Sequence, residues 1–182
     1  MQMIAKLRTL YDDLENRRHA LIAELELCSE AALSFQPEPD RWSILMVVEH
    51  MVMGERGVRL KGAEIVGEQI EADPQTEELF KAVIDILDKD VPVDVPDPSI
   101  EPVGDKNLPA LLSLWEAERK KLGNLLEAVT SADIGKALAR HTVTGPLNPV
   151  RTLELALAHF DTHHRQIRRI LADTKSGRGF TH

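Results

Sequence analysis

Two histidines four residues apart, His159 and His163, have the residue type and the spacing that binding of a metal ion requires. They follow Asn148-Pro149, which predicts a helix start, because Asn caps a first turn and Pro there loses no needed N–H. Residues four apart on a helix project about 40° apart and reach one ion, whereas residues five apart point about 140° away from each other. This spacing excludes His164 from the pair, although the apolar stripe of the helix passes nearer to His164 than to His159.

Two imidazoles cannot complete a tetrahedral metal site, and His50 is the best candidate for a third ligand. It lies in an apolar helical segment, Trp42 to Met51, and the positions three and four residues away from it are apolar or glycine. A single histidine on such a stripe is most often a core residue with one satisfied hydrogen bond. The pair formed by His159 and His163 shifts the balance toward a three-histidine site.

Three neutral imidazoles with a fourth coordination position open are typical of a catalytic metal site. Zn²⁺ is favoured by its abundance, and Ni²⁺, Mn²⁺, Fe²⁺ and Co²⁺ accept the same ligands. The open position could bind water, or a thiolate or carbonyl oxygen of a substrate, which is the chemistry of hydrolysis or of transfer to a thiol. Asp161 and Gln166 are candidate acceptors for the second ring nitrogen of a ligand, with ordinary surface or interhelical contacts as the alternative.

Arg18 and Glu118 each interrupt an apolar stripe near the middle of a predicted helix. They could line the site at the level of the histidines, which makes them the candidate catalytic residues. The alternative is a buried ion pair, or side chains that extend to water.

Length and composition predict one helical domain, residues 1–174, followed by a flexible tail, residues 175–182. The net charge of −8 argues against a general nucleic-acid or anionic-membrane binder. No apolar stretch approaches the roughly 18 residues of a membrane span, and the first residues lack the pattern of a signal peptide. The single cysteine, Cys28, favours a reducing compartment, so we expect a cytoplasmic protein.

Apolar residues at alternating spacings of three and four predict four long helices and a short one. Proline and glycine mark the connections, among them a proline-rich segment, 91–106, that we interpret as a surface loop or a lid. The predicted helices cover residues 4–28, 43–70, 76–89, 107–129 and 149–173, and the connection 131–147 ends in a Gly-Pro turn. The economical fold is all-α, an antiparallel four-helix bundle with the short extra helix between the second and third long helices.

Three short motifs, taken in order, resemble the DinB/YfiT-like superfamily of four-helix-bundle metal-dependent enzymes. Trp42-Ser43-Ile44 followed by His50 is similar to the first-ligand segment of that family. Residues 141–147 (HTVTGPL) are similar to its turn before the last helix, where Pro often stands in place of Thr142. Residues 159–167 (HFDTHHRQI) are similar to its last-helix motif, and the resemblance covers nearly the whole chain in helix order and length.

The resemblance implies an up-down-down-up bundle that holds a divalent metal through His50, His159 and His163, commonly in a homodimer. Characterised relatives include S-transferases and isomerases that use bacillithiol, mycothiol or glutathione. We therefore expect the ion to activate a low-molecular-weight thiol or a water for attack on a small electrophilic substrate. A non-enzymatic metal- or ligand-binding helical bundle is the alternative. The DNA-damage association of the family name does not imply DNA binding, and the acidic charge balance agrees.

Overall fold

The computed structural model describes residues 3–65, 69–70, 73–89 and 100–176. This part of the chain is mostly helical, which confirms the helical character predicted from the sequence. Within these ranges, none of the helices combines the length and the apolarity that a bilayer span requires. The elements in chain order are α1 (Ala5–Glu26), α2 (Glu30–Ser34), α3 (Ile44–Ile65), α4 (Pro74–Asp88), α5 (Leu108–Ala128), β1 (Ala139–His141), β2 (Gly145–Leu147) and α6 (Pro149–Ser176).

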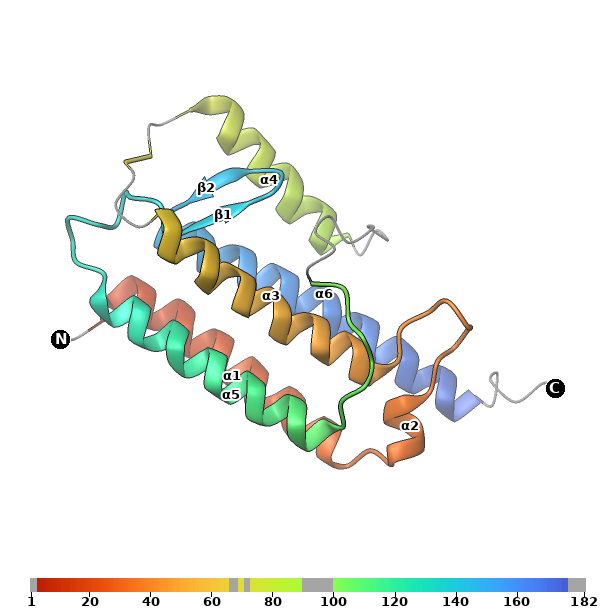
Figure 1. Ribbon diagram of the computed structural model, residues 1–182. Helices are drawn as coiled ribbons and strands as arrows, with labels where there is room; N and C mark the ends of the chain where they lie inside the picture. The colour runs from red at the N-terminus through yellow and green to blue at the C-terminus, as the bar shows by residue number, and fades with distance from the viewer. Residues whose placement is uncertain (1–2, 66–68, 71–72, 90–99, 177–182) are drawn as a thin grey trace.

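The long helices α1, α3, α5 and α6 lie side by side along a common direction (Figure 1). α1 packs on α6, and α3 packs on both α5 and α6. Followed from their N-terminal ends, α1 and α6 run one way in Figure 1, and α3 and α5 run the other way. The shorter α4 packs on α6, and β1 packs on α3. His50 and the histidine pair are therefore carried by two helices, α3 and α6, that are in contact and run in opposite directions.

The apolar stripes read from the sequence form the core between these helices. α1 contributes Leu7, Leu14, Leu21 and Leu25, each at most 1% exposed. Removing such side chains from water is the main favourable term in packing amphipathic helices together. The other long helices contribute buried aliphatic and aromatic side chains, among them Val47, Val48, Leu111, Trp115, Leu126, Leu153, Phe160 and Ile167.

Side-chain caps fix where the helices that flank the site begin. Asn107 accepts a hydrogen bond from the N–H of Ala110, and Asn148 accepts one from the N–H of Arg151. The cap at Asn148 was predicted from the sequence, and that prediction is confirmed. Asp73 caps α4 in the same way.

A small hairpin was not predicted. β1 pairs antiparallel with β2, and the N–H of Leu138 donates to the carbonyl of Leu147 at 2.8 Å just outside the paired strands. The predicted Gly-Pro turn is wrong, because Gly145 and Pro146 lie in β2 and the chain reverses before them. Gly145 has a φ of 73°, a left-handed value that favours glycine where the turn enters the strand. Strands of three residues are too short to produce a recognisable alternation of apolar and polar residues.

One helix boundary differs from the prediction, and one short helix was not predicted. The helix predicted to reach Ile70 ends at Ile65, and Gln69 instead forms an isolated antiparallel bridge with Lys136. The short helix α2 lies in the connection predicted after α1, and the side chain of Ser29 caps it. Both differences arise where tertiary contacts or a single cap decide the local structure.

Two predicted segments lie partly outside the described residues. Of the proline-rich segment 91–106, the structure describes residues 100–106, which run beside α3, and residues 90–99 lie outside the description. Of the predicted tail, α6 includes residues up to Ser176, so the first tail residues are helical. Residues 177–182 lie outside the description.

Candidate metal centre

Three imidazoles from two helices meet between α3 and α6. His50 extends from α3, and His159 and His163 extend from consecutive turns of α6. The Nε2 atom of His159 lies 3.2 Å from Nε2 of His50 and 3.1 Å from Nε2 of His163. One ligand atom from each ring lies within 4.8 Å of the other two. The structure thus brings together the three residues that the sequence singled out as metal ligands.

The second ring nitrogen of two of these histidines meets an oxygen acceptor. His50 Nδ1 donates to the main-chain carbonyl of Ile100 at 2.8 Å, and His163 Nδ1 donates to Gln166 Oε1 at 2.8 Å. A neutral imidazole carries one proton, so Nε2 of each of these two rings keeps a lone pair, and both lone pairs face His159 Nε2. His159 Nε2 has at most one proton to donate, so the three converging Nε2 atoms share at most one proton. The remaining lone pairs are the ones that a bound cation would satisfy.

The surroundings keep the three imidazoles neutral. Burial lowers the pKa of His50, and burial together with the nearby His50 lowers the pKa of His163 to about 4. Burial, reinforced by His163, His50 and His141, holds the pKa of His159 well below its ordinary value. Near neutral pH the three rings are therefore in the uncharged form that binds a metal.

The distances between the ring nitrogens fit a divalent ion. Nitrogens bound tetrahedrally at about 2.0–2.1 Å from one Zn²⁺ lie roughly 3.3 Å apart. The two short distances in the cluster, 3.1 and 3.2 Å, are close to that value. Imidazoles held by an oxygen acceptor on the second ring nitrogen are the usual ligands of such ions. The residues present therefore fit the metal that the motif predicts.

The family of the chain follows from its comparison with known proteins. The family model of the DinB superfamily matches residues 13–167, a range that begins within α1 and ends just after the histidine motif of α6. The chain belongs to the DinB superfamily. This confirms the family that the sequence motifs indicated. No curated protein and no solved structure matches the chain.

Two contacts of this DinB site come from residues that sequence reasoning missed. The acceptor of His50 is the carbonyl of Ile100, and a main-chain carbonyl has no signature in a sequence. The carboxylate of Glu49, the residue before His50, accepts hydrogen bonds from the Gly104 N–H and from Lys106 Nζ, both at 2.7 Å. The described part of the proline-rich segment therefore lies directly beside the histidine cluster.

The two residues that the sequence suggested as hydrogen-bond acceptors for the ligands, Asp161 and Gln166, make different contacts in the structure. Gln166 holds His163, so that prediction is confirmed. Asp161 instead forms an ion pair with Arg17 of α1. His164, which the spacing excluded from the pair, has its Nε2 3.4 Å from a carboxylate oxygen of Glu24.

Arg18 and Glu118 lie on α1 and α5. Arg18 is 2% exposed and donates to Glu15 and Glu116, and its guanidinium carbon lies 6.0 Å from the ring centroid of Trp115. Glu118 accepts a hydrogen bond from Lys121 Nζ at 2.9 Å. These contacts correspond to the ion-pair alternative, and a catalytic role for Arg18 and Glu118 stays a prediction.

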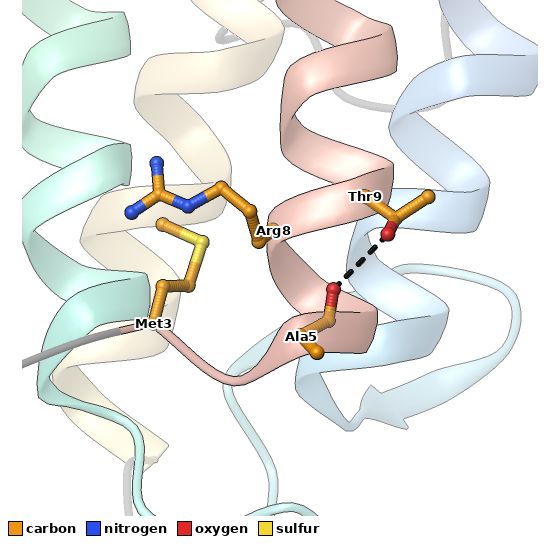
Figure 2. A pocket seen from close by; sticks show the side chains of 4 residues that line it. All are labelled: Met3, Ala5, Arg8 and Thr9. Carbon is orange, nitrogen blue, oxygen red and sulfur yellow. Dashed lines mark hydrogen bonds between the residues drawn. The ribbon is translucent and has the colours of Figure 1, made fainter.

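Two surface hollows lie away from the histidines of this DinB protein. The first, of about 480 Å³, is lined by Met3, Ala5, Arg8 and Thr9 at the start of α1. Figure 2 shows the side chain of Arg8 beside that of Met3, and a hydrogen bond from Thr9 Oγ1 to the Ala5 carbonyl. Neither lining contains a histidine or a cysteine. The second hollow, of about 330 Å³, is lined by Lys6, Ile134, Asn148, Val150, Arg151 and Glu154.

Proposed function

We propose that this protein is a divalent-metal-dependent enzyme in which His50, His159 and His163 hold the ion. The observation that carries the proposal is the convergence of three Nε2 atoms with more lone pairs than protons among them. Buried polar groups require partners, and one cation would satisfy all three nitrogens at once. Zn²⁺ is favoured by its abundance, and Ni²⁺, Mn²⁺, Fe²⁺ and Co²⁺ accept the same donors.

The proposed reaction is the attack of a low-molecular-weight thiol, or of water, on a small electrophilic substrate. The ion would supply Lewis acidity, which lowers the pKa of a thiol or a water enough for deprotonation near neutral pH. His50 and His163 keep their protons on Nδ1, bound to Ile100 and Gln166, so these two rings serve as ligands and not as acids. The ring of Trp42, whose centroid lies 4.9 Å from that of His50, limits rotation of the imidazole.

We further propose that residues 1–174 form one domain with the up-down-down-up four-helix bundle of the family, acting in the cytoplasm as a homodimer. The opposed directions of α1 with α6 and of α3 with α5 support the bundle (Figure 1). The single cysteine supports a reducing compartment. The dimer rests on the family resemblance.

Metal content, measured by mass spectrometry on protein purified without a metal-affinity tag, tests the proposal. We expect about one ion per wild-type chain and less than about a tenth of that for His159→Ala, because two imidazoles hold a divalent ion far more weakly than three. His164→Ala is the matched control, since this histidine lies on the same helix but contacts Glu24, and it should keep the ion. Wild-type protein that stays empty when offered Zn²⁺, Ni²⁺ and Mn²⁺ would exclude the metal function.

A non-enzymatic metal- or ligand-binding bundle is the second candidate. The three imidazoles by themselves account for binding of an ion and do not require a reaction. A screen of metal-loaded protein for thiol transfer and for hydrolysis separates the two candidates. Turnover that disappears in His159→Ala supports the enzyme, and full metal occupancy without turnover supports the binding bundle.

A further inference from the structure

Residues 100–106, which we call the strap, are attached to two adjacent residues of α3. At one end of the strap, the Ile100 carbonyl accepts a hydrogen bond from His50 Nδ1. At the other end, Gly104 and Lys106 both donate to Glu49. Successive residues on a helix point about 100° apart, so the strap contacts two different sides of α3 at the level of the metal site.

Glu49 is a strong attachment point because its side chain is 5% exposed and both of its carboxylate oxygens accept hydrogen bonds from the strap. Oε2 accepts from the Gly104 N–H and Oε1 accepts from Lys106 Nζ, each at 2.7 Å. A buried carboxylate without such partners would carry a large desolvation penalty. Lys106 also contacts Asp105 of the strap at 2.6 Å, which orients the lysine toward α3.

Gly104 shows how closely the strap lies on α3. Its φ of 77° is in the left-handed region that favours glycine. A Cβ at this position would meet Cγ of Met46 at 3.1 Å, which is tighter than ordinary contact. Met46 lies one helical turn before His50, so a side chain at position 104 would be strained at this φ and would press on the helix that carries the metal ligand.

We propose that Glu49 is a positioning residue for the metal centre: it clamps the strap so that the Ile100 carbonyl stays at His50 Nδ1. This inference rests on the proposed metal function of the three histidines. His163 receives its acceptor, Gln166, from its own helix three residues away, whereas the acceptor of His50 comes from 50 residues further along the chain. The Glu49 contacts hold that distant acceptor in place and so keep Nε2 of His50 as the lone pair that faces the ion.

Titration calorimetry with Zn²⁺ on the full chain tests the clamp through metal affinity. Glu49→Gln breaks the contact with Lys106, and Gly104→Ala strains the strap without changing any charge. Loss of a group that orients a metal ligand weakens binding by about 10–100-fold, and we expect about a tenfold increase in Kd for each variant. Glu55→Gln is the matched control, because Glu55 is a partly buried carboxylate on the same helix whose hydrogen bonds run to Trp115 and Arg119 of α5. Its Kd should stay within about twofold of wild type.

A second measurement does not depend on the metal. In ¹⁵N-histidine NMR spectra of the metal-free protein, we expect His50 to carry its proton on Nδ1 in wild type and to become a mixture of tautomers in Glu49→Gln and Gly104→Ala. Wild-type affinity and an unchanged His50 tautomer in both variants would overturn the inference. Wild-type protein that binds no metal would overturn the proposed function instead, and a tautomer change in the variants would still support the clamp on His50.

Discussion

Two polar clusters in the described part of the chain differ in how their charged and hydrogen-bonding groups are balanced. The histidine cluster between α3 and α6 consists of bases alone, and its two shortest contacts join nitrogen to nitrogen. The second, which we call the arginine cluster, joins α1, α3 and α5 through Arg18, Arg119, Glu15 and Glu55. Arg18 and Arg119 are 2% and 1% exposed, yet each lies against carboxylates.

Cations and carboxylates pair with one another in the arginine cluster. Glu15 Oε1 lies 2.9 Å from Nε of Arg18 and 3.0 Å from Nη1 of Arg119. Glu55 accepts from Arg119 Nε at 2.9 Å and from the indole N–H of Trp115 at 2.7 Å. Burial by itself raises the pKa of Glu15, but the hydrogen bonds from Arg18 and the charge of Arg119 hold that pKa below its ordinary value. The charges of the cluster are therefore paired among these residues, although Arg119 Nη1 faces Glu15 without a well-aligned hydrogen bond.

The comparison teaches that burial of polar side chains does not by itself indicate a functional site. Both clusters interrupt apolar stripes and so look alike in the sequence. What separates them is composition: the arginines pair with carboxylates of opposite charge, whereas three bases that point at one another require a partner from outside. An excess of bases without matching acids therefore indicates a functional site better than burial of polar side chains does.

Removing a partner from the arginine cluster should give the largest effect on stability. Arg119→Ala leaves Glu15 and Glu55 without their shared cation and should lower the free energy of unfolding by about 3–5 kcal/mol, measured by urea denaturation. Arg8→Ala is the matched control, because Arg8 is a half-buried arginine whose side chain is 42% exposed and pairs with Glu127, and it should cost less than about 1 kcal/mol. Equal losses in the two variants would contradict a structural role for the cluster.

Acidification should destabilise the metal-free histidine cluster. The pKa of His163 is about 4 in the folded protein and 6.5 ordinarily, so the unfolded chain takes up the proton first as the pH falls. Stability that is present above about pH 6.5 is therefore lost progressively toward about pH 4, by about 2–3 kcal/mol for this residue. Urea denaturation at several pH values measures the loss. His163→Leu should show a shallower pH dependence, and identical slopes in wild type and His163→Leu would refute the explanation.

Gln166→Leu should give the smallest of these effects, and it separates orientation of a ligand from its presence. Without the acceptor at Nδ1, His163 can place its proton on either nitrogen, and we expect about a tenfold weaker Kd for Zn²⁺, or about 1.4 kcal/mol. Asp161→Asn, on the same helix but paired with Arg17, should leave the affinity unchanged. The interpretation fails if Asp161→Asn weakens binding as much as Gln166→Leu does.

The candidate site could be predicted from the sequence wherever local spacing decides the geometry. His159, His163 and Gln166 share one helix, and their separations of four and three residues place them together however the rest of the chain folds. His50 could be named because it is a polar residue on an apolar stripe. The long helices follow from the same periodicity, and Asn107 and Asn148 follow from the chemistry of capping.

The remaining contacts depend on tertiary packing. Nothing at Ile100 distinguishes its carbonyl from any other, and its position beside His50 depends on the path of the strap. Arg119 was not among the residues predicted from the sequence, although it lies four residues after Trp115 and therefore on the same face of α5. The hairpin and α2 are too short for a periodic pattern, and one cap or one pair of strands decides them.

The separation of His50 from His159 has a kinetic consequence. They are 109 residues apart, so an ion bound to both would close a very long loop and restrict the unfolded chain. α3 and α6 could then separate only after a metal–nitrogen bond breaks. The rate at which a chelator captures the ion would therefore report how often these two helices part, and loading the protein with metal should slow its global unfolding.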